Sequence, residues 1–234
     1  MSFLSAQNMT GGYDSVDILR DCSISVERGQ IAVIVGPNGA GKSTAMKAIF
    51  GLIMIKEGSI FLKGEDISML SPQQRVKKGM AFVPQTENVF TTLTVEENLE
   101  MGAYLRKDNI KPTKDQVFEL FPILHEKRNQ IAGELSGGQR QQVAVGRALM
   151  TNPSVLMLDE PTAGVSPLVT VELFERILAI KKAGVAVLMV EQNARQALEI
   201  ADMGYVLVTG ENKFQGTGKS LLENAEVRRS FLGG

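Results

Sequence analysis

The residues best suited to chemistry form a glycine-rich segment that ends in a lysine and two hydroxyl residues. It matches the phosphate-binding pattern G-x-x-x-x-G-K-[ST] at every constrained position. The glycines permit tight turns that aim backbone N–H groups at a phosphate chain, the lysine can reach the β- and γ-phosphates, and the first hydroxyl can ligate Mg²⁺. The pattern predicts an ATP site made by Gly36, Pro37, Asn38, Gly39, Ala40, Gly41, Lys42, Ser43 and Thr44.

The residues on either side of this segment indicate whether it is a nucleotide-binding site or a chance match to the pattern. Residues 31–35 are a continuous apolar run, which is typical of a buried parallel strand. Residues 43–50 have the composition of a helix, whose positive N-terminal end would face the phosphates. A strand before the loop and a helix after it favour nucleotide binding.

A second group of polar residues follows another apolar run, 155–158. Asp159 at the end of this predicted strand can hold Mg²⁺, and Glu160 can orient the water that attacks the γ-phosphate. The alternative is an exposed acidic pair that ends a strand. Gln85, which follows Pro84, can supply a neutral oxygen to the metal, although only its position supports that role.

The segment Leu135-Ser136-Gly137-Gly138-Gln139 leads directly into a predicted helix. It offers a second cluster of N–H groups at a positive helix end, although a simple capped turn would look the same. Beside the first phosphate loop the capped turn is the weaker reading. Two phosphate cradles in one chain indicate that each ATP is shared between two copies.

The elements that must position these residues alternate between strands and helices, which predicts an α/β fold with a parallel sheet covered on both faces. Strand patterns disappear from about residue 86, where helical spacing at 95–105, 114–121 and 140–150 indicates a helical insertion. An amphipathic helix is expected at 168–182. We expect strands at 3–9, 18–26, 31–35, 58–62, 80–83, 155–158, 185–190 and, as the last one, 205–208, followed by a turn at 210–212.

Composition excludes several classes. The 234 residues suit one sizeable domain, and a net charge of −1 argues against a general nucleic-acid binder. Cys22, the single cysteine, lies in an alternating stretch and is expected in the core. No apolar run approaches the roughly 20 residues that span a bilayer, and the N-terminus has no signal-peptide pattern. We therefore expect any membrane role to depend on other subunits.

Taken together, the motifs at 36–44, 85, 135–139 and 155–160 resemble those of ABC transporter ATP-binding subunits over essentially the whole chain. The resemblance implies a P-loop NTPase (RecA-like) core with an antiparallel β subdomain and an inserted α-helical subdomain. The single domain 1–234 would then divide into a core with the β subdomain, 1–85 and 152–234, and a helical signature subdomain, 86–151.

The resemblance also implies a head-to-tail dimer with two ATP molecules at its interface. Ser136, Gly137 and Gly138 of one subunit would contact the γ-phosphate held by the phosphate loop of the other. Tyr13 matches the aromatic residue that stacks on adenine in this family; without the family it would be a packed loop residue.

Two positions depart from the family pattern. Ser166 stands where an aspartate is usual, and it can still cap the helix that Pro167 begins, so its role in communication between the two sites is the open point. Gln192 replaces the switch histidine; its amide can donate to the γ-phosphate but cannot accept a proton. The only histidine, His125, is expected on the surface. We assign catalysis to Lys42, Glu160 and Gln192.

The run 190–193, Val-Glu-Gln-Asn, together with 93–99 and the terminal Phe-Leu-Gly-Gly, resembles the shorter ATPase subunit of branched-chain amino-acid importers. This predicts an ATPase on the inner face of a prokaryotic plasma membrane, partnered by permease subunits and a second ATPase, with no nucleic acid. Val89, Phe90 and Leu93 would receive the permease or be core. The alternatives are a lipid or lipopolysaccharide exporter, an ATP switch in DNA repair or translation, and a weakly active regulatory subunit.

Overall fold

The computed structural model describes residues 2–13 and 16–231, and its centre is a six-stranded sheet. The strand order is β10-β9-β3-β8-β7-β6, with β10 antiparallel to β9 and the other pairs parallel. Every residue of β3, β7 and β8 is buried, which explains their unbroken apolar sequences. The strands are β3 (Ile31–Val35), β6 (Met80–Val83), β7 (Val155–Asp159), β8 (Ala186–Val190), β9 (Met203–Val208) and β10 (Glu211–Gly216).

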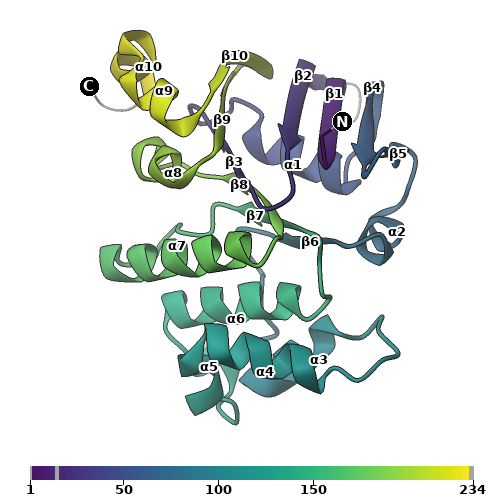
Figure 1. Cartoon of the computed structure of the whole chain (residues 1–234), viewed down its shortest axis with the longest axis vertical. Coiled ribbons are helices and arrows are strands. Elements are labelled where there is room, and N and C mark those ends of the chain that lie inside the picture. Colours follow the sequence, from purple (N-terminus) through teal and green to yellow (C-terminus); the bar gives the residue numbers. More distant parts are fainter. Residues whose placement is uncertain (1, 14–15, 232–234) are drawn as a thin grey trace.

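The sheet separates two hydrophobic cores. Alternate residues of β3 enter different cores, with Ala32 and Ile34 on the face of α1 (Lys42–Phe50) and Val33 on the opposite face. That opposite face is covered by α7 (Pro167–Lys182) and α8 (Ala194–Ile200), as Figure 1 shows. The prediction of a sheet covered on both faces is therefore confirmed.

A second, antiparallel sheet stands beside α1, with strand order β2-β1-β4-β5 (Figure 1). Cys22, a residue of β2, is fully buried, as expected. After this sheet, Ser71 caps α2 (Pro72–Lys77) in a reciprocal capping box with Gln74. The strands are β1 (Leu4–Tyr13), β2 (Val16–Val26), β4 (Ile55–Leu62) and β5 (Glu65–Asp66).

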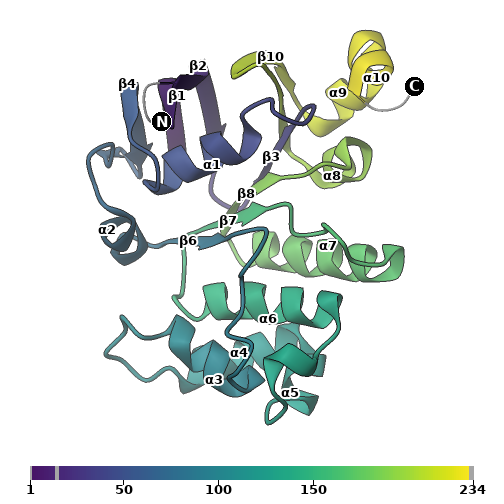
Figure 2. The ribbon, with the colours of Figure 1, turned by 180° about the vertical axis from the view of Figure 1, so that it is seen from behind.

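A block of helices lies between β6 and β7 in sequence and occupies one end of the molecule, seen from both sides in Figures 1 and 2. Its apolar side chains join the core on the α7 face of the sheet. The block consists of α3 (Val95–Gly102), α4 (Lys111–Leu120), α5 (Pro122–Glu126), a 3₁₀ turn (Ala132–Glu134) and α6 (Gly137–Leu149).

The C-terminal part differs from the prediction, because β9 is not the last strand. Thr209 and Gly210 have φ values of 51° and 85° and form a two-residue turn, after which β10 pairs with β9. The turn was expected at 210–212, but it occupies 209–210, and residues 211 and 212 already belong to β10. Residues of β10 alternate between exposed and half-buried, so no apolar pattern marked the strand. It is followed by α9 (Gly218–Glu223) and α10 (Ala225–Phe231).

Candidate ATP site

The phosphate loop connects the carboxyl end of β3 to the start of α1, and its backbone requires glycine. Gly39 and Gly41 have φ values of 78° and 93°. A Cβ at Gly36 would lie 2.2 Å from the carbonyl oxygen of Leu207. No side chain caps α1 at Gly41, so its first-turn N–H groups are available to an anion.

Lys42 lies along this loop and is only 5% exposed. Its ammonium donates to the carbonyl oxygens of Gly36 at 3.0 Å and Pro37 at 3.1 Å. The turn is closed by a hydrogen bond from Ala40 N–H to Pro37 O. Three features thus converge at one place: backbone donors, a helix N-terminus and a buried positive charge. Such a loop binds phosphate groups.

Ser43 and Asp159 meet beside the loop, although 115 residues lie between them in the sequence. The Ser43 hydroxyl donates to Asp159 Oδ1 at 2.9 Å. Burial raises the pKa of Asp159, while the Ser43 hydrogen bond and the charges of Lys47 and Lys42 oppose that rise. A carboxylate and a hydroxyl are hard oxygen ligands, so this pair fits Mg²⁺.

Glu160 is held at the end of β7 in a left-handed conformation, with φ of 47°. Its N–H donates to Val190 O at 2.9 Å, and its carboxylate accepts a 2.7 Å hydrogen bond from Gln85 Nε2. The structure thus brings Gln85 to Glu160. The loop after Gln85 is fixed in turn by Asn88, whose amide donates to Gln141 of α6 at 2.8 Å.

Gln192 follows β8 and lies exposed at the same edge of the sheet. It lines a cleft of about 450 Å³ together with Glu160, Thr162 and Glu191. Glu160 and Gln192 thus lie at the ends of the adjacent strands β7 and β8.

The signature segment lies at the start of α6. Ser136 caps the helix, and its capping box with Gln139 uses hydrogen bonds of 3.1 and 3.2 Å. Leu135 is buried in the core of the helical block, and Gly138 packs so closely that a Cβ would lie 2.5 Å from Val169 Cγ1. Ser136 and Gly137 remain exposed.

The phosphate loop and the signature segment belong to different faces of the six-stranded sheet. The phosphate loop leads into α1 on one face of the six-stranded sheet, whereas the signature segment leads into α6, whose core residues belong to the other face (Figure 1). The capped-turn description of residues 135–139 is correct locally. Ser136 and Gly137 remain exposed at this turn.

Tyr13 ends β1 next to the phosphate-loop helix and is 44% exposed. Lys47 of α1 donates to its hydroxyl at 3.3 Å, and the lysine ammonium lies 5.9 Å from the ring centroid. The ring is therefore a half-exposed aromatic surface one helical turn from the loop. Sequence reasoning missed Lys47, because nothing in the pattern distinguishes it from a surface lysine.

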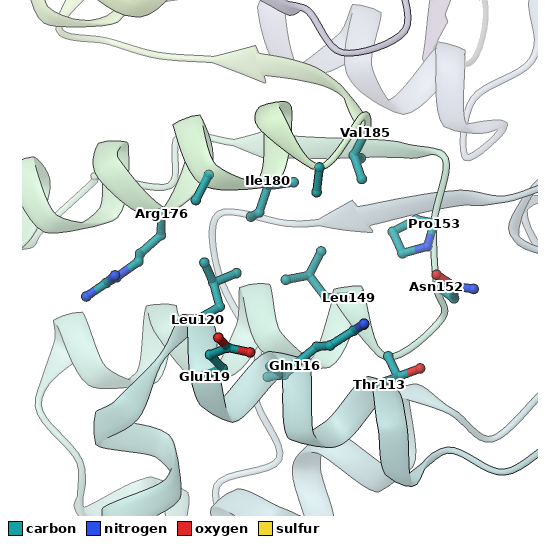
Figure 3. Close-up of a pocket in the computed structure, with 13 residues that line it drawn as sticks. Thr113, Gln116, Glu119, Leu120, Leu149, Asn152, Pro153, Arg176, Ile180 and Val185 are labelled. Atoms are coloured by element: carbon teal, nitrogen blue, oxygen red, sulfur yellow. The ribbon is translucent and has the colours of Figure 1, made fainter.

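Another cleft lies between α4, α6 and α7 (Figure 3). It holds about 640 Å³, and Leu120 and Leu149 project from below toward Ile180 of α7. None of the predicted site residues lines it.

Two residues near the site escaped the sequence analysis, Glu191 and Thr162. The signal was present: Glu191 directly follows a fully apolar strand, as Asp159 ends the neighbouring one. We assigned Glu191 no role because only the residue after it corresponded to a known motif position.

Residues 19–163 match the ABC transporter family. The chain belongs to this family. Two solved ABC transporter ATP-binding cassettes, one free of nucleotide and one in an ADP conformation, superimpose with TM-scores of 0.88 and 0.89 at 30% identity, each covering 100% of both chains. The chain is an ABC transporter ATPase, and its expected fold class is confirmed.

Several curated relatives of this ABC ATPase carry transport names. BraG of Pseudomonas aeruginosa, a high-affinity branched-chain amino acid transport ATP-binding protein, is 43% identical over 99% of this chain and 100% of its own length. A probable LivF of Archaeoglobus fulgidus is 43% identical over 98% of both chains. LptB of Haemophilus influenzae, from a lipopolysaccharide export system, is 35% identical over 100% of this chain and 98% of its own length.

Among the described residues, no helix has both the length and the apolar content needed to cross a bilayer.

Proposed function

We propose that this ABC ATPase powers import of branched-chain, hydrophobic amino acids through separate permease subunits. The observation that carries the proposal is the 43% identity, over nearly the full chain, to BraG and LivF. The Glu-Gln-Asn run at 191–193 supports the same branch. In this arrangement the chain lies at the cytoplasmic face of the plasma membrane.

We assign the ATP site as follows. Gly36–Thr44 hold the phosphates, Lys42 neutralises charge at the β- and γ-phosphates, and Tyr13 stacks on adenine. Ser43, Asp159 and Gln85 would hold Mg²⁺, which supplies charge neutralisation to the phosphates when bound. The proximity of Ser43 and Asp159 supports the metal assignment.

Hydrolysis requires a polarised water and a stabilised γ-phosphate. Glu160 has a carboxylate at the edge of the cleft that also contains Gln192. We assign Glu160 as the group that orients the water and accepts its proton, and Gln192 as an amide donor to the γ-phosphate. The hydrogen bond from Gln85 holds Glu160 in place until nucleotide binds.

The site is completed by a second ATPase subunit in a head-to-tail dimer. The placement of the phosphate loop and the signature segment on opposite faces of the sheet supports this, since they belong to separate cores of one chain. Residues Leu135–Gln139 of the partner would cover the γ-phosphate. We further propose that the helical block, 86–151, moves toward the partner as a unit.

The permease would dock on the exposed apolar side of the helical block. Phe90, Met101, Tyr104 and Leu105 are large apolar residues with 44–79% of their surface exposed. Buried Asn98 ties the Phe90 loop to α3 through hydrogen bonds to the Phe90 N–H and carbonyl at 2.8 and 2.9 Å. The sequence suggested Val89, Phe90 and Leu93 for this contact. Val89 and Leu93 are half-buried, so we include only Phe90 in the proposed surface.

Export of lipopolysaccharide is the second candidate, supported by the 35% identity to LptB. Purification of the tagged chain from its native membranes separates the two. We expect membrane subunits whose reconstituted complex imports labelled leucine with ATP hydrolysis. Stimulation by lipopolysaccharide without amino-acid uptake would support the exporter, and recovery of nucleic acid without membrane subunits would contradict both.

A further inference from the structure

The carboxylate of Glu191 lies beside the proposed hydrolysis residues, yet none of the roles above uses it. Glu191 follows β8 and is only 1% exposed. Burial raises the pKa of its side chain to about 7, and the charge of Glu160 acts in the same direction, while hydrogen bonds from Thr162 and Gln192 oppose the rise. A buried carboxyl group is costly unless its oxygens are hydrogen-bonded, so its partners show what it does.

All three hydrogen bonds to this carboxylate come from the proposed hydrolysis segments. Thr162, in the loop after Glu160, donates from its N–H to Oε1 at 3.1 Å and from its hydroxyl to Oε2 at 2.9 Å. The N–H of Gln192 donates to Oε2 at 3.3 Å. One side chain therefore links the loop that carries Glu160 to the backbone of Gln192.

The same residue is anchored to the strand that enters the phosphate loop. The N–H of Glu191 donates to Ile34 O of β3 at 3.2 Å. Its neighbour Val190 accepts from Glu160 N–H, and Glu160 adopts a left-handed backbone that non-glycine residues rarely occupy. Such a conformation persists only where surrounding contacts fix it.

We propose that Glu191 is a positioning residue for ATP hydrolysis. Its carboxylate holds Thr162 and the backbone of Gln192, so that Glu160 and Gln192 face one cleft at a fixed distance from the phosphate loop. The proposal rests on the hydrolysis roles assigned above to Glu160 and Gln192.

The chemistry requires a carboxylate rather than an amide. Both oxygens of Glu191 accept from a backbone N–H, one from Thr162 and one from Gln192. In Glu191→Gln the side-chain NH₂ must face one of those two N–H groups, whichever way the amide turns. Two donors repel, so either the Thr162 loop or the Gln192 backbone must shift.

The test compares Glu191→Gln, Thr162→Val and the double variant in the purified full-length chain with Mg²⁺ and ATP. We expect each single variant to lower kcat about tenfold, the cost of an unmade buried hydrogen bond, with Kd for ATP changed less than about twofold. The double variant should lose no more than the worse single one, because both changes break one link. The melting temperature of Glu191→Gln should fall by no more than a few degrees, because removal of a buried charge offsets part of the cost of the unmade hydrogen bond.

A matched control exists in the helical block. Thr94 donates from its N–H and its hydroxyl to Glu97 Oε2 at 2.7 and 2.8 Å, the same pairing on an exposed helix end. Glu97→Gln should leave kcat unchanged.

Glu160→Gln, measured in parallel, separates this proposal from the proposed function. Loss of turnover in Glu160→Gln with wild-type kcat in Glu191→Gln would overturn the positioning role alone. Normal turnover in Glu160→Gln would overturn the role of Glu160 instead. Additive losses at Glu191 and Thr162 would also contradict the link, and if Glu191→Gln does not fold, unchanged kcat in Thr162→Val overturns the proposal.

Discussion

Gln192 shows how one side chain narrows the possible mechanisms. A carboxamide donates and accepts hydrogen bonds but does not titrate near neutral pH, so it can position the γ-phosphate without taking part in proton transfer. Its exposure at the end of β8, in one cleft with Glu160, fits that limited role.

Gln192→Ala should therefore lower kcat about tenfold, corresponding to about 1.4 kcal/mol of transition-state stabilisation, while Kd for ATP changes less than about twofold. Steady-state ATPase assays and nucleotide titrations measure the two quantities. Gln116→Ala, in the cleft of Figure 3, is the control and should change neither. Equal losses in turnover and binding would show that Gln192 only binds ATP.

The thiol of Cys22 makes the stability of the fold depend on pH. Burial raises the pKa of its thiol to about 12 from 9.0, with a smaller contribution from Asp21. The folded chain therefore retains a proton that the unfolded chain releases, and stability falls as pH rises from about 9 to about 12. Denaturant unfolding of Cys22→Ala and wild type should show a stability difference that changes across this range; a pH-independent difference would contradict it.

Two neighbouring glycines at the start of α6 differ in how closely they pack against other parts of the chain. A Cβ at Gly138 would lie 2.5 Å from Val169 of α7, whereas at Gly137 the nearest atom is Gly164 O at 3.8 Å. The start of α6 is thus pressed against α7 on one side and open on the other.

Gly138→Ala should destabilise the fold by about 1–3 kcal/mol, because Val169 is stiff and α6 must move away from α7. Gly137→Ala, the matched control, should be neutral or slightly stabilising, since alanine favours the helix. Chemical denaturation gives both values. Equal stabilities would show that the contact relaxes at no cost.

At the same scale, the sequence predicted the buried strands better than the exposed ones. β3 and β6 have the predicted bounds because short apolar runs such as Ile31–Val35 are typical of strands buried in a covered sheet. β10 was missed because its exposed residues carry no apolar pattern, and its turn depends on positive φ at Thr209 and Gly210. The motifs predicted which residues gather at the strand ends. They could not predict that Glu191 joins them, since its hydrogen bond from Thr162 spans two strand ends.

The whole molecule is built around a sheet that separates the phosphate loop from the signature segment. The phosphate loop belongs to the α1 face and the signature segment to the α6 face, and the described chain offers no element that brings them together. By our proposal, ATP bound at Gly36–Thr44 takes its remaining contacts from another subunit, so the activity of one chain depends on its neighbour.

The most direct test is ATP turnover by mixed variants. Lys42→Ala removes the phosphate-loop charge, and Ser136→Arg blocks the signature segment; by our account each is inactive alone. A mixture should recover activity, because a Ser136→Arg phosphate loop can pair with an intact signature segment of a Lys42→Ala chain. Turnover at the wild-type rate by Ser136→Arg alone, at any protein concentration, would contradict the shared site.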